Sequence, residues 1–235
     1  MNRLKQVYSA YTEEDFQVWK LLFDRQLANL QDKACAEYLQ GLKLLQPVLN
    51  ADAIPEFGAL NKLLKELSGW TIEVVPGLIP VNEFFEMLSQ KKFPSSTWLR
   101  KRDQLDYLEE PDMFHDIFGH IPQLVHPDYS NFMQKFGEIG YKNHSDKEKV
   151  IRLQRLYWFT IEFGLIETTS GVRIYGAGIT SSEKETKHIF LDSIIVKAYD
   201  KETIMQTDYI ISDIQKVYFK IDSFSNLYDS LLTEC

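Results

Sequence analysis

The chain has 235 residues, of which 44% are hydrophobic and 26% are charged, proportions that are ordinary for a globular protein. Its net charge of −8 argues against a nucleic-acid or anionic-membrane partner, because phosphate binding requires a basic face. The apolar runs are far shorter than a membrane span, and the first residues lack the apolar core of a signal peptide. We therefore expect a cytoplasmic protein with no nucleic-acid and no membrane partner.

Apolar residues at steps of three and four predict helices in the first part of the chain, with each apolar stripe forming core. These stretches are Phe16–Leu30, Cys35–Leu45, Leu60–Leu67 and Val81–Leu88. Gly69 ends the third helix, and the alternation over Ile72–Val75 predicts a short strand. Cys35 and Cys235 have neither metal nor redox spacing, so we expect Cys35 to be a buried thiol.

The second half of the chain adds helices and short strands. Pro127 opens a helix, and a long helix is predicted from about Lys147 to Ile166. Further elements are strands at Val172–Tyr175, Ile194–Val196 and Val217–Ile221, a helix with a capping box of Ser182 and Glu185, and a closing helix at Phe224–Leu232. The pattern predicts a mostly α fold with small β elements (α+β), as a single domain over residues 1–235 with 1–14 as a loose N-terminal segment.

Two histidines, His115 and His120, stand five residues apart in the stretch LDYLEEPDMFHDIFGHI. On an uninterrupted α-helix such residues point about 140° apart, so their imidazoles could not share a metal there. Gly119 can end a helix and Pro122 follows it. We therefore predict a helix opened at Pro111 that carries His115, with His120 turned back beyond the helix end. Taken alone, such a pair is more often two ordinary core or surface histidines.

Glu162 is the only charged residue in the apolar run LYWFTIEFGLI. A buried carboxylate is paired, protonated or bound to a metal, because an isolated buried charge is costly. Arg152 or Arg155 could pair with Glu162, but both are predicted on the polar side of the same helix. Two imidazoles and one carboxylate, with no cysteine nearby, favour a non-haem Fe(II) site that keeps positions open for oxygen. The HExxH pattern of zinc peptidases is absent, because Asp116 follows His115.

Three segments, EPDMFHDIFGHIP, LYWFTIEFGL and RIYGAGITSS, carry a resemblance to a known family. In this order and spacing they resemble the pterin-dependent aromatic amino acid hydroxylases, and most closely the short bacterial phenylalanine 4-hydroxylases. The similarity runs from the helix at Phe16 to the final VYFKIDSF. It implies the catalytic fold of that family, Fe(II), a tetrahydropterin such as tetrahydrobiopterin, O2 as co-substrate, and hydroxylation of phenylalanine to tyrosine. It also implies neither a regulatory domain nor a tetramerisation helix, so we expect a monomer or weak homo-oligomer.

The resemblance assigns roles to individual residues. His115, His120 and Glu162 would hold the iron as the catalytic ligands. The residues that would meet the pterin are Gly77, Leu78, Ile79, Phe84, Asp116 and Tyr157. The residues assigned to the substrate side are Arg100, Pro111, Asp112, Trp158, Gly178 and Ser181. In that set Arg100 would grip the substrate carboxylate, Asp112 would orient Arg100, and Ser181 would support the first histidine. Without the resemblance, three of these residues have simpler interpretations. Arg100 could belong to a solvated basic patch, Phe84 could be a core residue, and Asp112 could be a charge at the start of a helix.

One departure from the family leaves the substrate open. Glu183-Lys184-Glu185 stands where the family usually has a small residue and glycine before the glutamate, and this adds charge beside the expected pocket. Trp158 would crowd a bulky indole, which favours phenylalanine, but tyrosine and tryptophan hydroxylation stay open. A metal-dependent hydrolase with the same ligands and an inactive binding protein are the alternatives from other classes.

Overall fold

The computed structural model describes residues 4–106, 108, 110–211 and 213–232. Its α-helices are α1 Glu13–Leu30, α2 Ala36–Leu45, α3 Phe57–Ser68, α4 Val81–Ser89, α5 Pro127–Asn143, α6 Lys147–Tyr157, α7 Ala177–Thr180, α8 Glu183–His188, α9 Lys201–Gln206 and α10 Phe224–Ser230. Two segments are π-helical, η3 His115–His120 and η5 Trp158–Glu162. Short 3-10 helices are η1 Tyr8–Ala10, η2 Arg102–Gln104 and η4 Pro122–Val125. The strands are β1 Thr71–Val74, β2 Lys92–Ser95, β3 Gly164–Thr168, β4 Gly171–Ile174, β5 Ile195–Ala198 and β6 Val217–Ile221.

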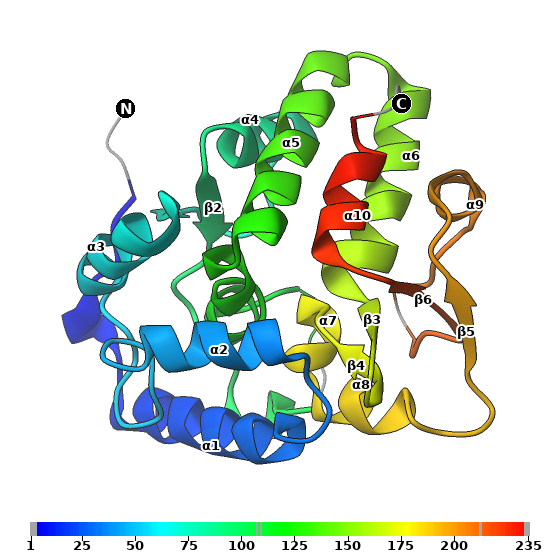
Figure 1. Cartoon of the computed structure of the whole chain (residues 1–235). Helices are drawn as coiled ribbons and strands as arrows, with labels where there is room; N and C mark the ends of the chain where they lie inside the picture. The colour runs from blue at the N-terminus through cyan, green and yellow to red at the C-terminus, as the bar shows by residue number, and fades with distance from the viewer. Residues whose placement is uncertain (1–3, 107, 109, 212, 233–235) are drawn as a thin grey trace.

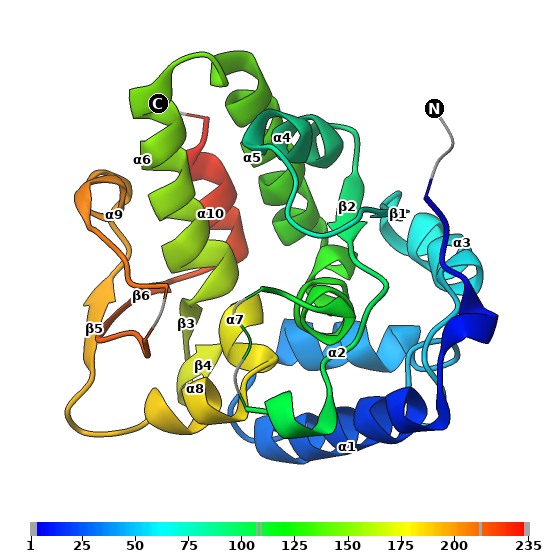
Figure 2. The same cartoon turned by 180° about the vertical axis from the view of Figure 1, so that it is seen from behind.

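The helices form two groups around the centre of the molecule. In both views α1 and α2 lie side by side at one end, while α5, α6 and α10 stand together at the other (Figures 1 and 2). The chain around η3 passes between the two groups (Figure 1). Beside them lies a mixed four-stranded sheet with the order β4-β3-β6-β5, and β1 and β2 form a separate parallel pair. The predicted class, mostly α with small β elements, is confirmed. Among the described residues, no helix is both long and apolar enough to cross a membrane.

The helices in the first part of the chain form where the apolar periodicity predicts them. In α1 the buried side chains of Trp19 and Phe23 lie on the predicted face. Thr12 and Asp15 close a capping box at its start, which satisfies backbone donors that would otherwise lack partners. Gly69 ends α3 in the left-handed conformation, with φ of 80°, as a glycine readily does.

Two further expectations concern the N-terminal segment and the cysteines. Tyr8 and Tyr11, in the segment expected to be loose, donate hydrogen bonds to the carbonyl oxygens of Ile54 and Thr97. Cys35 is buried, and burial raises the pKa of its thiol to about 12. Residues 1–3 and Cys235 lie outside the described residues.

The predicted long helix from Lys147 to Ile166 is wrong beyond Glu162. The helix continues as a π-turn to Glu162, and Gly164 then begins β3, which pairs in parallel with β6. A Cβ at Gly164 would overlap the ring of Tyr175 and the carbonyl oxygen of Thr160. Sheet pairing and this close approach therefore override the helical period of the apolar run.

Other elements differ in smaller ways from the prediction. The strand β2 was not predicted, because Pro94 reads as a break between helix and loop. Pro94 is tolerated because both strands of a two-stranded sheet are edge strands. On the unpaired side of an edge strand, no backbone N–H is needed for sheet pairing. The predicted strand at Ile194–Val196 lies one or two residues later, as β5. The helices α7 and α9 are too short to show a period and were not predicted either.

The contact between α4 and α5 supplies a test of the packing. A Cβ at Gly140 would overlap the buried ring of Phe85, so Gly140→Ala is expected to destabilise the protein by about 1–3 kcal/mol. Gly58→Ala in α3 is the matched control, because nothing lies within 4 Å of the added Cβ. Its stability should stay unchanged or rise by up to about 1 kcal/mol. Urea unfolding followed by circular dichroism measures both, and equal stabilities would contradict the packing.

Candidate metal centre and ligand cavity

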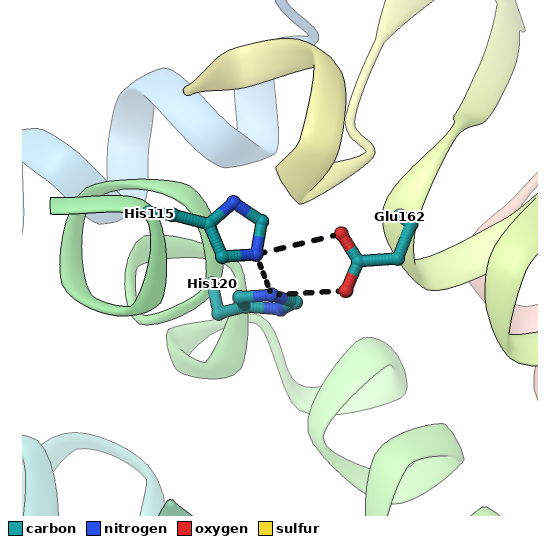
Figure 3. A group of neighbouring side chains, drawn as sticks. All are labelled: His115, His120 and Glu162. Carbon is teal, nitrogen blue, oxygen red and sulfur yellow. Dashed lines mark hydrogen bonds and ion pairs between the residues drawn. The ribbon is translucent and has the colours of Figure 1, made fainter. Parts of the chain in front are cut away.

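Three predicted ligands meet in one cluster. The Nε2 atom of His120 lies 3.1 Å from Nε2 of His115 and 3.2 Å from Oε1 of Glu162. Nε2 of His115 lies 3.6 Å from Oε2 of Glu162, so the three side chains converge on one point (Figure 3). In the part of the chain that the structure describes, no other group of three histidine, cysteine, aspartate or glutamate residues converges in this way.

The histidines meet because their segment is a π-helix. The predicted helix exit at Gly119 is wrong, since helical backbone runs through His120 to Ile121, with φ −65° and ψ −39°. In a π-helix the backbone bond joins residues five apart, so two such residues stand one above the other on the same face. Gly119 serves close packing instead, because a Cβ there would lie 2.9 Å from the carbonyl oxygen of Ala177.

Glu162 reaches the cluster through a second π-turn. The backbone N–H of Phe163 donates to the carbonyl oxygen of Trp158, five residues earlier, at 2.9 Å. Phe163 then leaves helical geometry, with φ −121° and ψ 27°, and the chain turns into β3. Glu162 is thus the last helical residue, and its carboxylate points towards the two imidazoles (Figure 3).

Ser181 determines the tautomer of His115. The Ser181 hydroxyl donates to the carbonyl oxygen of Ala177 at 2.7 Å, so its only proton is used. Its 2.8 Å contact with Nδ1 of His115 must therefore be a bond that it accepts from Nδ1–H. This leaves Nε2 of His115 without a proton, so its lone pair faces the cluster as a metal ligand requires.

The protonation states of the cluster suit metal binding. Burial lowers the pKa of His115 to about 4, so this imidazole is neutral near pH 7. Burial raises the pKa of Glu162, but the two histidines outweigh that effect and leave the pKa at about 2. The Tyr157 hydroxyl also bonds to Glu162 and lowers its pKa. A neutral imidazole and a carboxylate are the forms in which these groups bind metals.

No arginine or lysine neutralises Glu162 among the described residues. Arg152 instead pairs with Glu202 at 2.6 Å and Arg155 with Asp208 at 2.5 Å, so the prediction that both lie on the polar side is confirmed. Ligand atoms about 2.1 Å from a shared ion lie roughly 3.0 Å apart at octahedral angles and roughly 3.4 Å apart at tetrahedral angles. The three observed separations are 3.1, 3.2 and 3.6 Å, close to the spacing that one shared ion needs. The donor set contains nitrogen and oxygen and no thiolate, so it fits Fe(II) better than a structural zinc.

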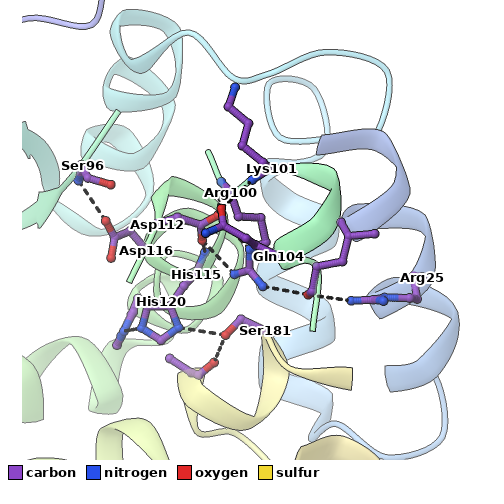
Figure 4. A network of polar contacts seen from close by, with 12 residues as sticks. Arg25, Ser96, Arg100, Lys101, Gln104, Asp112, His115, Asp116, His120 and Ser181 are labelled. Atoms are coloured by element: carbon purple, nitrogen blue, oxygen red, sulfur yellow. Dashed lines mark hydrogen bonds and ion pairs between the residues drawn. The ribbon is translucent and has the colours of Figure 1, made fainter. Parts of the chain in front are cut away.

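A second polar cluster lies beside the histidines. Arg100 donates from Nε and Nη2 to the two oxygens of Asp112, at 2.9 and 2.8 Å, and both residues are buried (Figure 4). Burial raises the pKa of Asp112, but the bonds from Arg100 outweigh it and leave the pKa low. Arg100 also donates from Nη1 to the carbonyl oxygen of Leu105, at 3.1 Å. Three of its five N–H donors are then used, and one remains on each terminal nitrogen.

The cavity in front of both clusters measures about 670 Å³, within the range of small-molecule sites. Every residue predicted for the site lines it except Asp112, which lies behind Arg100. The predicted pterin side brings together Gly77, Leu78, Ile79, Phe84, Asp116 and Tyr157, and the substrate side Arg100, Pro111, Trp158, Gly178 and Ser181. The geometry thus places all fifteen predicted residues in or directly behind one cavity.

Two residues of the predicted pterin side have defined partners. Asp116 accepts a bond from the backbone N–H of Ser96 at 2.9 Å (Figure 4), and burial raises the pKa of its carboxyl to about 7. The ring of Phe84 packs edge-on against Tyr157, with centroids 5.3 Å apart. These contacts hold one wall of the cavity before any ligand binds.

Further lining residues escaped the sequence analysis. Phe163, Tyr209 and Gln215 line the cavity, and the sequence analysis gave none of them a role. Glu185 was predicted to close a capping box, and that half of the prediction is wrong. Ser182 caps α8, but the Glu185 carboxylate bonds to Tyr218 at 2.6 Å instead. The charged triplet Glu183-Lys184-Glu185 was the one sequence signal for the part of the cavity wall near Glu185 and Gln215.

Comparison with known proteins identifies the family. The model of the biopterin-dependent aromatic amino acid hydroxylases matches residues 3–233. The chain belongs to this family. It is 47% identical to a phenylalanine-4-hydroxylase from Ralstonia nicotianae, over 97% of this chain and 72% of that protein.

Solved hydroxylases from the same family share the fold. A phenylalanine hydroxylase from Chromobacterium violaceum with bound Fe(III) and 7,8-dihydrobiopterin is 44% identical, with a TM-score of 0.94 over 98% of this chain and 83% of that one. The same enzyme with iron and phenylalanine bound is 42% identical, with a TM-score of 0.93 over 99% of this chain and 84% of that one. The predicted family and fold are therefore confirmed.

The role of Ser181 can be tested by metal affinity. Ser181→Ala removes the acceptor for Nδ1–H of His115, so the ring loses its fixed tautomer and orientation. We expect metal affinity to fall about 10- to 100-fold, the usual cost of losing such a partner. Ser182→Ala is the control, because it removes the cap of α8, worth about 1 kcal/mol of stability, and leaves the histidine untouched. Anaerobic Fe(II) titration compares the two, and equal affinities would contradict the assignment.

Proposed function

We propose that this chain is an Fe(II)- and tetrahydropterin-dependent phenylalanine 4-hydroxylase, which forms tyrosine with O2 as co-substrate. The observation that carries the proposal is that the metal cluster and the buried Arg100–Asp112 pair share one cavity. The first fits a metal that activates oxygen, and the second fits the carboxylate of an amino acid. Relatives named phenylalanine-4-hydroxylase support the choice of substrate.

His115, His120 and Glu162 would hold the iron in this cavity. When bound, the iron and the reduced pterin activate O2 and supply the oxygen that is added to the substrate ring. With His115, His120 and Glu162 as the protein ligands, positions on the metal would stay open for the reactants. Ser181 keeps the proton of His115 on Nδ1, and Tyr157 donates to the Glu162 carboxylate, so both ligands stay oriented.

Arg100 would bind the substrate carboxylate. Its guanidinium cannot swing, because Asp112 holds two of its nitrogens and Leu105 a third. The two remaining N–H groups can donate to the two oxygens of a carboxylate. The ring of the amino acid would then extend from Arg100 towards the metal, between Pro111, Gly178 and Trp158. The protein thereby contributes position and an environment poor in water.

The opposite wall of the cavity would take the pterin. The rings of Phe84 and Tyr157 supply an aromatic face, and the Gly77–Ile79 segment supplies backbone groups for the polar edge of the bicycle. Asp116, held by the backbone of Ser96, lies on the same side. A monomeric or weakly associated cytoplasmic enzyme without nucleic-acid partners completes the proposal.

The decisive test is oxygen consumption by anaerobically iron-loaded protein with a tetrahydropterin, offering phenylalanine, tyrosine and tryptophan in turn. We expect phenylalanine to give the highest rate, with one tyrosine formed for each O2 consumed. A higher rate with tyrosine or tryptophan would show that phenylalanine is not the preferred substrate, while the chain would still be an aromatic amino acid hydroxylase. Absence of oxygen consumption with all three would favour a hydrolase or a binding protein with the same ligands.

The ligand role of Glu162 predicts a complete loss of activity on substitution. Glu162→Ala should abolish hydroxylation and weaken iron binding by more than about 100-fold, which exceeds the cost of losing an outer partner. The fold should persist, because the substitution removes a buried charge rather than core packing. Glu167→Ala in β3 is the control, since this carboxylate pairs with Lys220 away from the cavity. Turnover by Glu162→Ala at the parent rate would refute the ligand assignment.

The role of Arg100 predicts a selective effect on substrate binding. Arg100→Lys keeps a positive charge beside Asp112 but lacks the planar fork. The KM for phenylalanine should rise about 10- to 100-fold, with a smaller change in kcat. Arg102→Lys, a change at an exposed position of the same basic run, should leave both constants unchanged. Steady-state kinetics distinguish these outcomes, and an unchanged KM in Arg100→Lys would remove Arg100 from the substrate site.

A further inference from the structure

Trp158 forms a fixed wall of the cavity. Its indole stacks on Tyr209, with ring centroids 4.5 Å apart and planes 18° from parallel. It also contacts Phe163, the residue that follows Glu162, with ring centroids 4.8 Å apart. All three rings line the cavity. Ring stacking alone leaves an indole free to turn in its plane, so a further contact is needed to fix its edge.

Gln215 supplies that contact. Its side-chain Oε1 accepts the indole Nε1–H of Trp158 at 3.1 Å. Its Nε2 donates to the carbonyl oxygens of Ile210 and Asp213, at 2.5 and 3.3 Å. Rotating the amide by half a turn would bring its NH2 group against the indole N–H and its oxygen against two carbonyls. Only one orientation of the buried amide satisfies these three partners.

Glu185 holds Gln215 from behind. The buried Glu185 carboxylate accepts the Tyr218 hydroxyl at 2.6 Å and the backbone N–H of Gln215 at 3.4 Å. Tyr218 belongs to β6, and Glu185 lies in the first turn of α8. Glu185 forms no ion pair with lysine or arginine within the described residues, and burial raises the pKa of its carboxyl. The Glu185 carboxylate, held by two neutral donors, therefore links α8, β6 and the loop that carries Gln215.

We propose that Gln215 and Glu185 are positioning residues that fix the orientation of Trp158 and so determine which aromatic ring the cavity admits. The inference rests on the proposed hydroxylase function, and it names the residues that determine which aromatic amino acid that hydroxylase prefers. Removing Oε1 of Gln215 leaves a half-buried indole N–H without its acceptor, so Trp158 turns to find another partner. The wall then moves away from the ring site, and an indole-sized substrate gains room.

The orientation of Trp158 can be measured without metal, pterin or substrate. In protein labelled with ¹⁵N-tryptophan, the four tryptophans give four indole N–H resonances, and Trp158→Phe identifies one of them. Gln215→Leu should shift this resonance and speed its exchange with solvent. Glu183→Gln, whose carboxylate pairs with Arg25 and Lys187 outside the cavity, should leave the resonance and its slow exchange unchanged. An unchanged resonance in Gln215→Leu would overturn the proposal.

Selectivity is the second measurement. The ratio of kcat/KM for phenylalanine to that for tryptophan should fall about tenfold or more in Gln215→Leu, the scale on which pocket shape discriminates. Tyr218→Phe, which leaves the cavity lining intact and removes a bond to Glu185, should lower the ratio in the same direction. Glu183→Gln is the matched control, because this α8 carboxylate pairs with Arg25 and Lys187 outside the cavity. Its ratio should equal that of the parent.

The indole resonances and the selectivity ratio together distinguish a failure of this proposal from a failure of the proposed hydroxylase function. If the parent hydroxylates no aromatic amino acid, the proposed function fails, and the indole resonances still report whether Gln215 holds Trp158. If the parent is active and the ratio is the same in Gln215→Leu, Tyr218→Phe and Glu183→Gln, the selectivity role is refuted. A general loss of rate with an unchanged ratio would likewise refute it, because that is the effect of a merely structural residue.

Discussion

A buried carboxylate that has no lysine or arginine partner among the described residues is the constraint on which the centre of this molecule depends. Glu162 lies against His115 and His120, and the described residues provide it with no lysine or arginine. Such a charge is costly unless a cation or a set of donors meets it. Both ligand segments adopt π-helical turns, a rare conformation that occurs mostly at functional sites, and those turns bring the three side chains together.

The proposed substrate site depends on the same segment as the metal cluster. Asp112 precedes the π-turn, and its Oδ1 accepts both from Nη2 of Arg100 and from the backbone N–H of His115, at 2.8 and 3.0 Å. One buried carboxylate therefore orients the arginine and the start of the histidine segment together. A change in the position of either group would be transmitted to the other through this carboxylate. In the proposed function, Asp112 would therefore help to fix the distance between the amino acid held by Arg100 and the metal held by His115.

Apolar periodicity predicted most of the longer α-helices and the class of fold, and the resemblance named residues that line the cavity, but neither indicated the local geometry that assembles the three ligands. The periodicity in Phe16–Leu30 is a direct signal of a helix face, and a single charge in an apolar run marks Glu162. No comparable signal marks a π-turn, so Gly119 was mistaken for a helix end. The bonds of Gln215 and Glu185 join segments far apart in the chain, and such contacts follow from tertiary packing rather than from any local pattern.

The central claim is that two imidazoles and one carboxylate from the two π-turns hold one iron. X-ray absorption at the iron edge, on protein loaded anaerobically with one equivalent of Fe(II), measures this ligand set directly. We predict a shell of only nitrogen and oxygen near 2.1 Å, roughly the distance of such ligands, with the outer scattering of two imidazoles. The imidazole scattering should diminish in His120→Ala. A sulfur ligand, or a spectrum that His120→Ala leaves unchanged, would contradict the account.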